Sequence, residues 1–265
     1  WPDLPIPIGA LKDPLSKWAA RCLERFAYKN AAQIVALSPG MAAGAARIGY
    51  PEHRITVVPN GSDLDFFRRD VVRAREFRRS LGISDDQIIV GYAGTLGRIN
   101  GVGFLVRVAA ALRDDERFVF VAVGDGQERE AITLLAREKS VLNRNFRMLP
   151  PVPKAEMPVV LSAFDIATSL FLPIREMEAN SANKFFDALA AGCCVAINYG
   201  GWQAKLLREA GAGIQLQGDP DGAAQDLKAL ISDPHRIQTL GQNARRLAER
   251  EFSRDELVAK IEAVI

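Results

Sequence analysis

The stretch FVFVAVGDG, residues 118–126, carries the clearest information about the fold. Six consecutive apolar residues, mostly valine and phenylalanine, are typical of a strand buried on both faces, and the turn GDG ends it. A second run of this kind, IIVGYAGTLG at residues 88–97, leads into apolar residues at helical spacing over residues 101–114. Strands that alternate with helices in this way predict an α/β fold with a Rossmann-like, doubly wound parallel sheet.

The same alternation extends in both directions from this stretch. Apolar runs predict strands at residues 34–37, 55–58, 88–94, 118–124, 146–149, 166–171, 194–198 and 213–216. Amphipathic patterns predict helices at residues 16–29, 40–48, 70–81, 101–114, 127–138, 154–162, 182–191, 203–210, 220–232, 234–250 and 254–265. Ligands of such sheets bind at the carboxyl ends of the strands near the switch point, so the loops that follow the strands are the candidate sites.

Composition excludes several classes of protein. The chain has 265 residues, of which 48% are hydrophobic and 25% charged, and this balance is that of a globular protein rather than a disordered or collagen-like one. A formal charge of +2 argues against a dedicated nucleic-acid binder, and no apolar run is long enough to span a bilayer. Three cysteines give no disulfide framework, which favours a reducing cytoplasm. We expect Cys193 and Cys194 to be buried as small apolar residues.

A domain boundary is predicted near VVPNGSDLDFF, residues 57–67, where a proline and an Asn-Gly turn indicate a connector. Two predicted strands precede it, too few for a stable sheet, and six follow it. The chain begins with Trp1 and a proline-rich segment that resembles the middle of a protein. We therefore expect residues 1–58 to be the tail of an N-terminal domain, 59–67 the connector, 68–250 a complete Rossmann-like domain and 251–265 a C-terminal helix.

The segment GTLGRING, residues 94–101, follows a strand and opens a helix. Its glycines allow the backbone to approach a ligand, helix N-terminal N–H groups attract anions, and Arg98 suits a diphosphate. The segment lacks the Gly-Lys-Ser/Thr of a P-loop, and a plain turn with a surface arginine is the alternative. The turn at Gly124–Gly126 is either part of the same ligand site or a simple tight turn.

The segment EMEANSANKFFDALAAG, residues 176–192, is the most informative candidate site. A polar loop leads into a helix for which Ser181 or Asn183 is the expected N-cap. Lys184 and Asp187 are three residues apart and therefore share one helix face. Lys184 and the helix N-terminus could hold phosphate, and Asp187 could accept hydrogen bonds from a ribose diol. The alternative is a capped helix with a surface ion pair.

Three further patterns concern metal ions and membranes. Asp63–Asp65 has the D-x-D shape of metal-dependent sugar transferases but lies in the connector, and His53 and His235 lack ligand partners at suitable spacing, so we expect no metal site. Six arginines within residues 68–80 indicate a solvated helix face or attraction to an anionic membrane surface.

The order of these motifs resembles glycosyltransferase family 4. The motifs are SPGM at residues 38–41, ITVVPNGSDLDFF at 55–67, YAGTLG at 92–97, VGDG at 123–126 and KFFDALAAG at 184–192. The resemblance implies a GT-B fold, in which two Rossmann-like domains face each other across a cleft. It makes residues 68–250 the C-terminal, nucleotide-sugar-binding domain and residues 1–58 the remnant of the acceptor domain.

The resemblance also implies roles for single residues. Arg98 matches the first diphosphate-binding arginine, whereas the following lysine of the family is Asn100 here, so that Lys184 would supply the second charge. Asp187 matches the ribose-binding Glu of the E-x7-E motif, whose first Glu falls on Ala179. Arg98 and Lys184 are then the expected catalytic residues. The expected substrate-binding residues are Gly97, Asn100, Gly101, Gly124, Leu149, Val152, Asn180, Ser181, Ala182, Asn183 and Asp187, with no metal and no cofactor besides the UDP-sugar substrate.

These departures, together with INYGGW at residues 197–202, resemble a bacterial subgroup that builds O-antigen, capsule or colanic acid. The subgroup implies a retaining, metal-independent transferase that moves an N-acetylated sugar from a UDP-sugar to a saccharide on undecaprenyl diphosphate. It also implies a peripheral position on the inner face of the cytoplasmic membrane, and we expect the fragment alone to be inactive. Two alternatives stay open: a UDP-sugar epimerase of the same fold, and a non-catalytic nucleotide-sugar-binding subunit.

Overall fold

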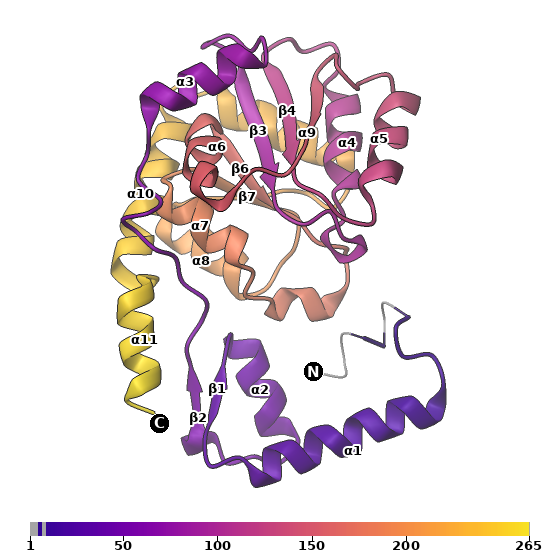
Figure 1. Ribbon diagram of the computed structural model, residues 1–265, viewed down its shortest axis with the longest axis vertical. Coiled ribbons are helices and arrows are strands. Elements are labelled where there is room, and N and C mark those ends of the chain that lie inside the picture. The colour runs from indigo at the N-terminus through magenta and orange to yellow at the C-terminus, as the bar shows by residue number, and fades with distance from the viewer. Residues whose placement is uncertain (1–4, 7–8, 265) are drawn as a thin grey trace.

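A six-stranded parallel sheet forms the main body of the protein, in a computed structural model that describes residues 5–6 and 9–264 (Figure 1). The strands are β3 (Ile88–Ala93), β4 (Phe118–Val123), β5 (Phe146–Leu149), β6 (Ile166–Ser169), β7 (Cys194–Ile197) and β8 (Gly213–Gln215). They lie in the order β5-β4-β3-β6-β7-β8. The chain builds one half of the sheet from β3 outward and then returns to build the other half from β6. The topological switch point therefore lies between β3 and β6.

Helices cover both faces of this sheet, which confirms the predicted doubly wound fold. One face packs against α3 (Val71–Ser80), α6 (Met157–Ala163), α7 (Asn183–Ala190), α8 (Trp202–Ala210) and α10 (Arg236–Glu251). The other packs against α4 (Gly103–Ala111), α5 (Arg129–Glu138) and α9 (Pro220–Ile231). Alternate residues of β4 enter opposite cores, with Phe120 on one side and Val121 on the other. Burial on both faces explains why the strands are continuously apolar in sequence.

Two predicted helices differ in the structure. The one expected at residues 101–114 is the shorter α4, which begins at Gly103, because Gly101 adopts the left-handed conformation with φ 57° and ends the preceding 3-10 turn η2 (Arg98–Asn100). The one expected at residues 154–162 consists of η3 (Lys154–Glu156) and α6, which has a proline in its first turn. The final residue of the predicted helix 254–265, and residues 1–4 and 7–8 of the proline-rich start, lie outside the described residues.

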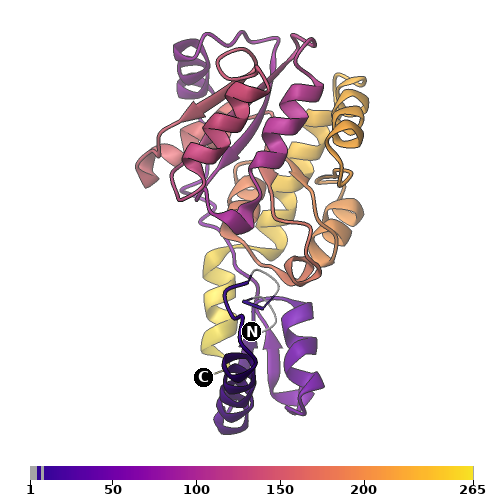
Figure 2. The ribbon, with the colours of Figure 1, turned by 90° about the vertical axis from the view of Figure 1, so that its right-hand side faces the viewer.

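The N-terminal segment forms a smaller unit of its own (Figures 1 and 2). It contains α1 (Pro14–Asn30), β1 (Ile34–Ala36), α2 (Pro39–Arg47), η1 (Glu52–Arg54) and β2 (Ile55–Val57). β1 and β2 pair in parallel and form a sheet separate from the six-stranded one. No residue of α1 is buried, and Leu15, Trp18, Leu23 and Phe26 are each more than half exposed.

The connector between the two sheets packs against the C-terminal part of the chain, where α11 (Arg254–Glu262) follows α10. α11 extends from the main body toward β1 and β2 (Figure 1). Gly61 leaves no room for a side chain, since a Cβ atom there would lie 2.5 Å from Leu257 Cδ1 and 2.6 Å from the carbonyl oxygen of Phe252. The connector is thereby held closely against the turn between α10 and α11.

The arginine-rich segment is only partly a solvated face. Arg78 on α3 is buried and donates hydrogen bonds to Asp165 Oδ2 at 2.9 Å, to the carbonyl oxygens of Ala163 and Ser84 at 3.0 Å each, and to that of Gln87. A buried charge requires such partners, so Arg78 is a structural residue rather than part of a basic surface.

Cys193 and Cys194 are buried, as expected from the sequence. Burial raises the pKa of each thiol to about 12, which keeps both protonated at neutral pH.

Candidate nucleotide-binding site

A cavity of about 330 Å³ opens at the switch point. β3 and β6 contribute backbone and small side chains, η2 contributes Asn100, and α7 contributes its first turns. The lining residues are Gly91, Ala93, Gly94, Thr95, Asn100, Met157, Leu161, Ala167, Thr168, Asn183, Lys184 and Asp187. The cavity therefore lies at the end of the sheet where ligands of doubly wound folds bind.

The two glycine-containing loops beside this cavity are joined by backbone hydrogen bonds. Leu96 N–H donates to the carbonyl oxygen of Asp125 at 2.8 Å, and Glu128 N–H donates to that of Leu96 at 2.9 Å. A Cβ atom on Gly124, which has φ 151°, would lie only 1.9 Å from the carbonyl oxygen of Gly94. Glycine is required here for close approach of two backbones, and the contact holds the loop at residues 94–101 against the turn after β4.

Lys184 extends from α7 back across the cavity. Its Nζ donates to Asn100 Oδ1 at 2.6 Å and to the hydroxyl of Tyr92 at 3.1 Å. The same atom lies 4.8 Å and 4.7 Å from the ring centroids of Tyr92 and Phe171. Within residues 5–6 and 9–264, no carboxylate forms an ion pair with it. Because no opposite charge compensates for its burial, the pKa of Lys184 is lowered to about 7.

Asn100 links Lys184 to the loop at residues 94–101. Its side chain is buried, accepts from Lys184 and donates through Nδ2 to the carbonyl oxygen of Thr95 at 2.8 Å. The Tyr92 hydroxyl donates to the same carbonyl at 2.7 Å. The family resemblance implies a lysine at position 100 of this loop. Here the amino group of Lys184, from α7, lies next to Asn100 instead.

Asp187 lies one turn after Lys184 and lines the same cavity. Its Oδ1 accepts a hydrogen bond from Ser62 Oγ at 2.7 Å. Burial raises the pKa of Asp187 to about 6, and the hydrogen bond from Ser62 opposes that rise. The predicted pairing of Lys184 and Asp187 on one helix face agrees with their common cavity. The sequence analysis missed Ser62, although it lies within the connector motif PNGSD.

The predicted capping of α7 is wrong. The helix begins at Asn183, and the N-cap position is Ala182, which offers no side-chain hydrogen bond. Ser181 is not the cap because its Oγ accepts from the backbone N–H of Asn60 at 3.1 Å. Asn180 is buried, its Oδ1 accepts from Ala182 N–H at 3.2 Å, and its carbonyl oxygen accepts from Trp202 Nε1 at 2.8 Å. The first turn of α7 therefore leaves its N–H groups without a capping side chain.

The other predicted site residues are not among those that line the cavity. Arg98 is exposed on η2, and Gly97 and Gly101 flank that turn. Leu149 is the last residue of β5, and its carbonyl oxygen already accepts from Arg129 Nη1 at 2.9 Å and from Gly124 N–H at 3.4 Å. The carbonyl oxygen of Leu149 therefore has little capacity left to accept a hydrogen bond from a substrate.

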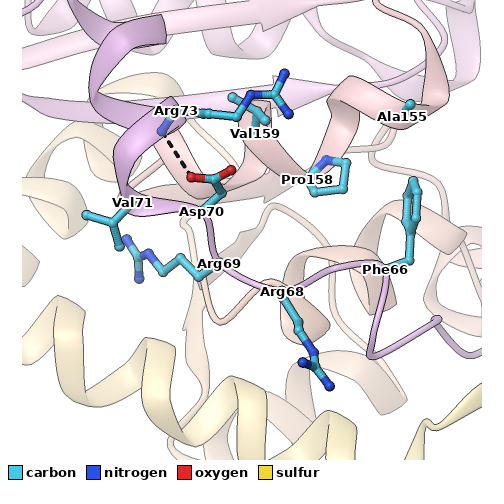
Figure 3. A pocket seen from close by; sticks show the side chains of 9 residues that line it. All are labelled: Phe66, Arg68, Arg69, Asp70, Val71, Arg73, Ala155, Pro158 and Val159. Atoms are coloured by element: carbon cyan, nitrogen blue, oxygen red, sulfur yellow. Dashed lines mark hydrogen bonds between the residues drawn. The ribbon is translucent and has the colours of Figure 1, made fainter.

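A second, more open cavity of about 640 Å³ lies beside the start of α3 (Figure 3). Arg68 and Arg73 line it, but Figure 3 shows their guanidinium groups pointing in different directions. Arg68 pairs with Asp65 at 2.5 Å and Arg73 with Glu156 at 2.5 Å. Because these charges are already paired and do not converge, the smaller cavity at the switch point is the stronger candidate site.

The carboxylates of the D-x-D segment are also paired. Asp63 Oδ2 lies 3.4 Å from Arg254 Nη1, and Asp63 Oδ1 accepts from the backbone N–H of Phe66 at 2.9 Å. Over the part of the chain that the structure describes, no group of three or more His, Cys, Asp or Glu side chains could hold a metal ion. Nor does any described helix combine the length and apolarity needed to cross a bilayer.

Comparison with known proteins assigns the family. Residues 87–233 match the family described as glycosyl transferases group 1, and residues 3–61 match the glycosyl transferase 4-like domain. The D-inositol 3-phosphate glycosyltransferase of Corynebacterium urealyticum is 32% identical over 219 residues, which cover 76% of this chain and 49% of that protein. The chain belongs to the group 1 glycosyltransferases. It spans about half the length of the curated relatives that it matches.

Two further similarities extend over most of the chain. The putative colanic acid biosynthesis glycosyl transferase WcaI of Escherichia coli is 23% identical over 247 residues, covering 90% of this chain and 58% of that protein. The crystal structure of Anabaena Alr3699/HepE in complex with UDP and glucose superimposes with a TM-score of 0.78 at 19% identity, covering 92% of this chain and 65% of that chain. The latter likeness supports the GT-B fold expected from the resemblance.

Proposed function

We propose that this chain is the donor-binding part of a retaining, metal-independent glycosyltransferase that uses a UDP-sugar. A single observation carries the proposal: Lys184 and Asp187, a cation and an acid one helical turn apart, line one cavity at the switch point of a doubly wound sheet. The cation suits the diphosphate, and the acid suits the ribose diol. The glycine-containing loop beside them allows a nucleotide to approach the backbone.

Catalysis in this proposal is electrostatic. As the bond between the sugar and UDP breaks, negative charge develops on the departing diphosphate. Lys184, Arg98 and the uncapped N–H groups of α7 would stabilise that charge, and preorganised groups of this kind commonly supply the largest part of a rate enhancement. With UDP bound, the charged forms of Lys184 and Arg98 would also take the place of a divalent ion, which is the basis for proposing that no metal is required.

The acceptor that we propose is a saccharide carried on undecaprenyl diphosphate, and the transferred sugar is N-acetylated. The similarity to a protein named for colanic acid biosynthesis supports this assignment. The rival acceptor is an inositol phosphate, after the name of two relatives that are each 32% identical to this chain. A lipid-linked acceptor implies that the sugar is transferred at the inner face of the cytoplasmic membrane. The arginines near α3 are not needed for that, because Arg78 is buried and Arg68 and Arg73 are paired.

The donor is tested by a thermal-shift titration of the chain with UDP, GDP, ADP and NAD, each with magnesium and with EDTA. A ligand at 100 times its dissociation constant stabilises a folded protein by about 2.7 kcal/mol, which is an easily measured shift. We expect a shift with UDP that EDTA leaves unchanged. A larger response to another nucleotide, or a response lost with EDTA, would contradict the proposed donor or the metal independence respectively.

A further inference from the structure

Ser62 lies in the connector, and its backbone is hydrogen-bonded to the turn between α10 and α11. It is fully buried, its N–H donates to the carbonyl oxygen of Phe252 at 2.9 Å, and its own carbonyl oxygen accepts from Arg254 N–H at 3.0 Å. These two bonds form a parallel bridge between Ser62 and Ser253. The neighbouring Gly61 packs so closely against Leu257 and Phe252 that a side chain there would collide with both.

The side chain of Ser62 points away from that bridge and reaches α7. Its Oγ donates to Asp187 Oδ1 at 2.7 Å. In the described part of the chain, no hydrogen bond is made to the second oxygen of Asp187, and the residue lines the cavity. One carboxylate oxygen is therefore occupied by the connector, and the other is left for a ligand.

The connector contacts the segment before α7 as well. Asn60 N–H donates to Ser181 Oγ at 3.1 Å, and Asn60 Nδ2 donates to the carbonyl oxygen of Ser181 at 2.5 Å. Asn60 and Ser62 thus attach the same short segment to both the start and the second turn of α7. An aspartate is one methylene shorter than the glutamate that the family resemblance places here, so a partner that fixes its rotamer has more influence on where its oxygens lie.

We propose that Ser62 is a positioning residue for the nucleotide: it holds the Asp187 carboxylate in the orientation that binds the ribose diol, and so makes nucleotide affinity depend on the position of the connector. The proposal rests on the proposed function, because it assumes that the ligand of Asp187 is a ribose. It adds a residue outside the two nucleotide-binding segments and a physical link between the two sheets of the protein.

The test compares Ser62→Ala with Ser253→Ala in the 265-residue chain. Ser253 is the matched control, since it shares the backbone bridge but its side chain makes no hydrogen bond in the described structure. Dissociation constants for UDP and for 2′,3′-dideoxy-UDP are measured by isothermal titration calorimetry. We expect Ser62→Ala to weaken UDP about tenfold and the dideoxy analogue by less than twofold, as for the loss of a hydrogen bond to a charged group. Ser253→Ala should leave both unchanged.

The pH profile provides a second readout that a purely structural role would not affect. The hydrogen bond from Ser62 lowers the pKa of Asp187, as do the nearby charges of Arg254 and Lys154, while burial raises it. Without the hydroxyl, Asp187 should protonate at a higher pH. The decline of UDP affinity on acidification should therefore begin at a higher pH in Ser62→Ala than in the wild type.

The outcomes separate this inference from the proposed function. Equal losses for UDP and its dideoxy analogue, an unchanged pH profile, or an effect of Ser62→Ala that persists in full in an Asp187→Asn background would each overturn the positioning role. Failure of the wild-type chain to bind UDP would instead remove the proposed function, and this inference with it.

Discussion

UDP binding should weaken with rising pH because the charge of Lys184 has no carboxylate partner among the described residues. With a pKa of about 7, half of these lysines are neutral at pH 7 in the unliganded protein. A diphosphate beside Nζ favours the charged form, so binding above pH 7 must take up a proton. About one tenth of the lysines are charged at pH 8, so we expect UDP to bind about fivefold more weakly there than at pH 7, and about tenfold more weakly for each further unit.

Isothermal titration calorimetry in two buffers of different ionisation enthalpy measures both the dissociation constant of UDP and the number of protons taken up on binding. Proton uptake should approach about 0.9 per UDP at pH 8. The terminal phosphate of UDP, with a second pKa near 6, stays ionised over this range and adds no slope of its own. Lys184→Met should bind weakly at every pH and lose the proton uptake. The control is Lys205→Met on α8, because Lys205 is exposed and pairs with Glu209 at 3.8 Å.

The pH dependence of the free energy of unfolding, measured without nucleotide, independently tests the lowered pKa of Lys184. Its pKa is lower in the folded chain than the value of 10.5 in an unfolded one, so the unfolded state binds more protons between about pH 7 and 10.5. The contribution of Lys184 to the free energy of unfolding therefore rises with pH across this window, by at most about 1.4 kcal/mol per unit. Affinity that stays constant from pH 7 to 9, or a slope that survives in Lys184→Met, would refute the reasoning.

Four other substitutions have expected outcomes. Arg98→Ala should weaken UDP about tenfold or more by loss of a charged hydrogen bond while leaving the melting temperature unchanged, because the side chain is exposed; unchanged affinity in calorimetry would remove Arg98 from the site. Asp187→Ala should weaken UDP more than inorganic diphosphate in the same assay, and equal losses would contradict a ribose role. Arg78→Ala should lower the free energy of unfolding in urea by about 3–5 kcal/mol, and a loss below 1 kcal/mol would refute its structural role. Gly124→Ala should lower the melting temperature far more than Gly218→Ala, since a Cβ collides with backbone at the first position and meets open space at the second.

The sheet could be predicted because its strands are buried on both faces and so leave uninterrupted apolar runs. β4 extends from Phe118 to Val123, and every one of its residues is buried. The common face of Lys184 and Asp187 could be predicted for an equally local reason, since residues three apart on a helix are neighbours. The division of the chain at residues 58 and 67 stays a prediction, although β1 and β2 do form a sheet of their own.

The contacts that define the site could not be predicted, because they join residues distant in sequence. Lys184 is 84 residues from Asn100 and 92 from Tyr92, and Asp187 is 125 residues from Ser62. The same cause explains the wrong N-cap: Ser181 has the right chemistry for a cap, but Asn60 uses its hydroxyl. The local preference of Ser181 for the N-cap position was overridden by its hydrogen bond with Asn60, which is 121 residues away in sequence.

The exposed apolar face of α1 is expected to promote association of this chain during purification. Leu15, Trp18 and Phe26 are each more than 60% exposed and lie at helical spacing, and Cys22, an exposed free thiol, falls between them. Apolar faces of this kind bring copies of a protein together in solution. Two such helices in contact would place their thiols close to one another. Preparations should therefore be dilute and contain a reductant, and a dimer that disappears on reduction should be attributed to α1 before it is attributed to biology.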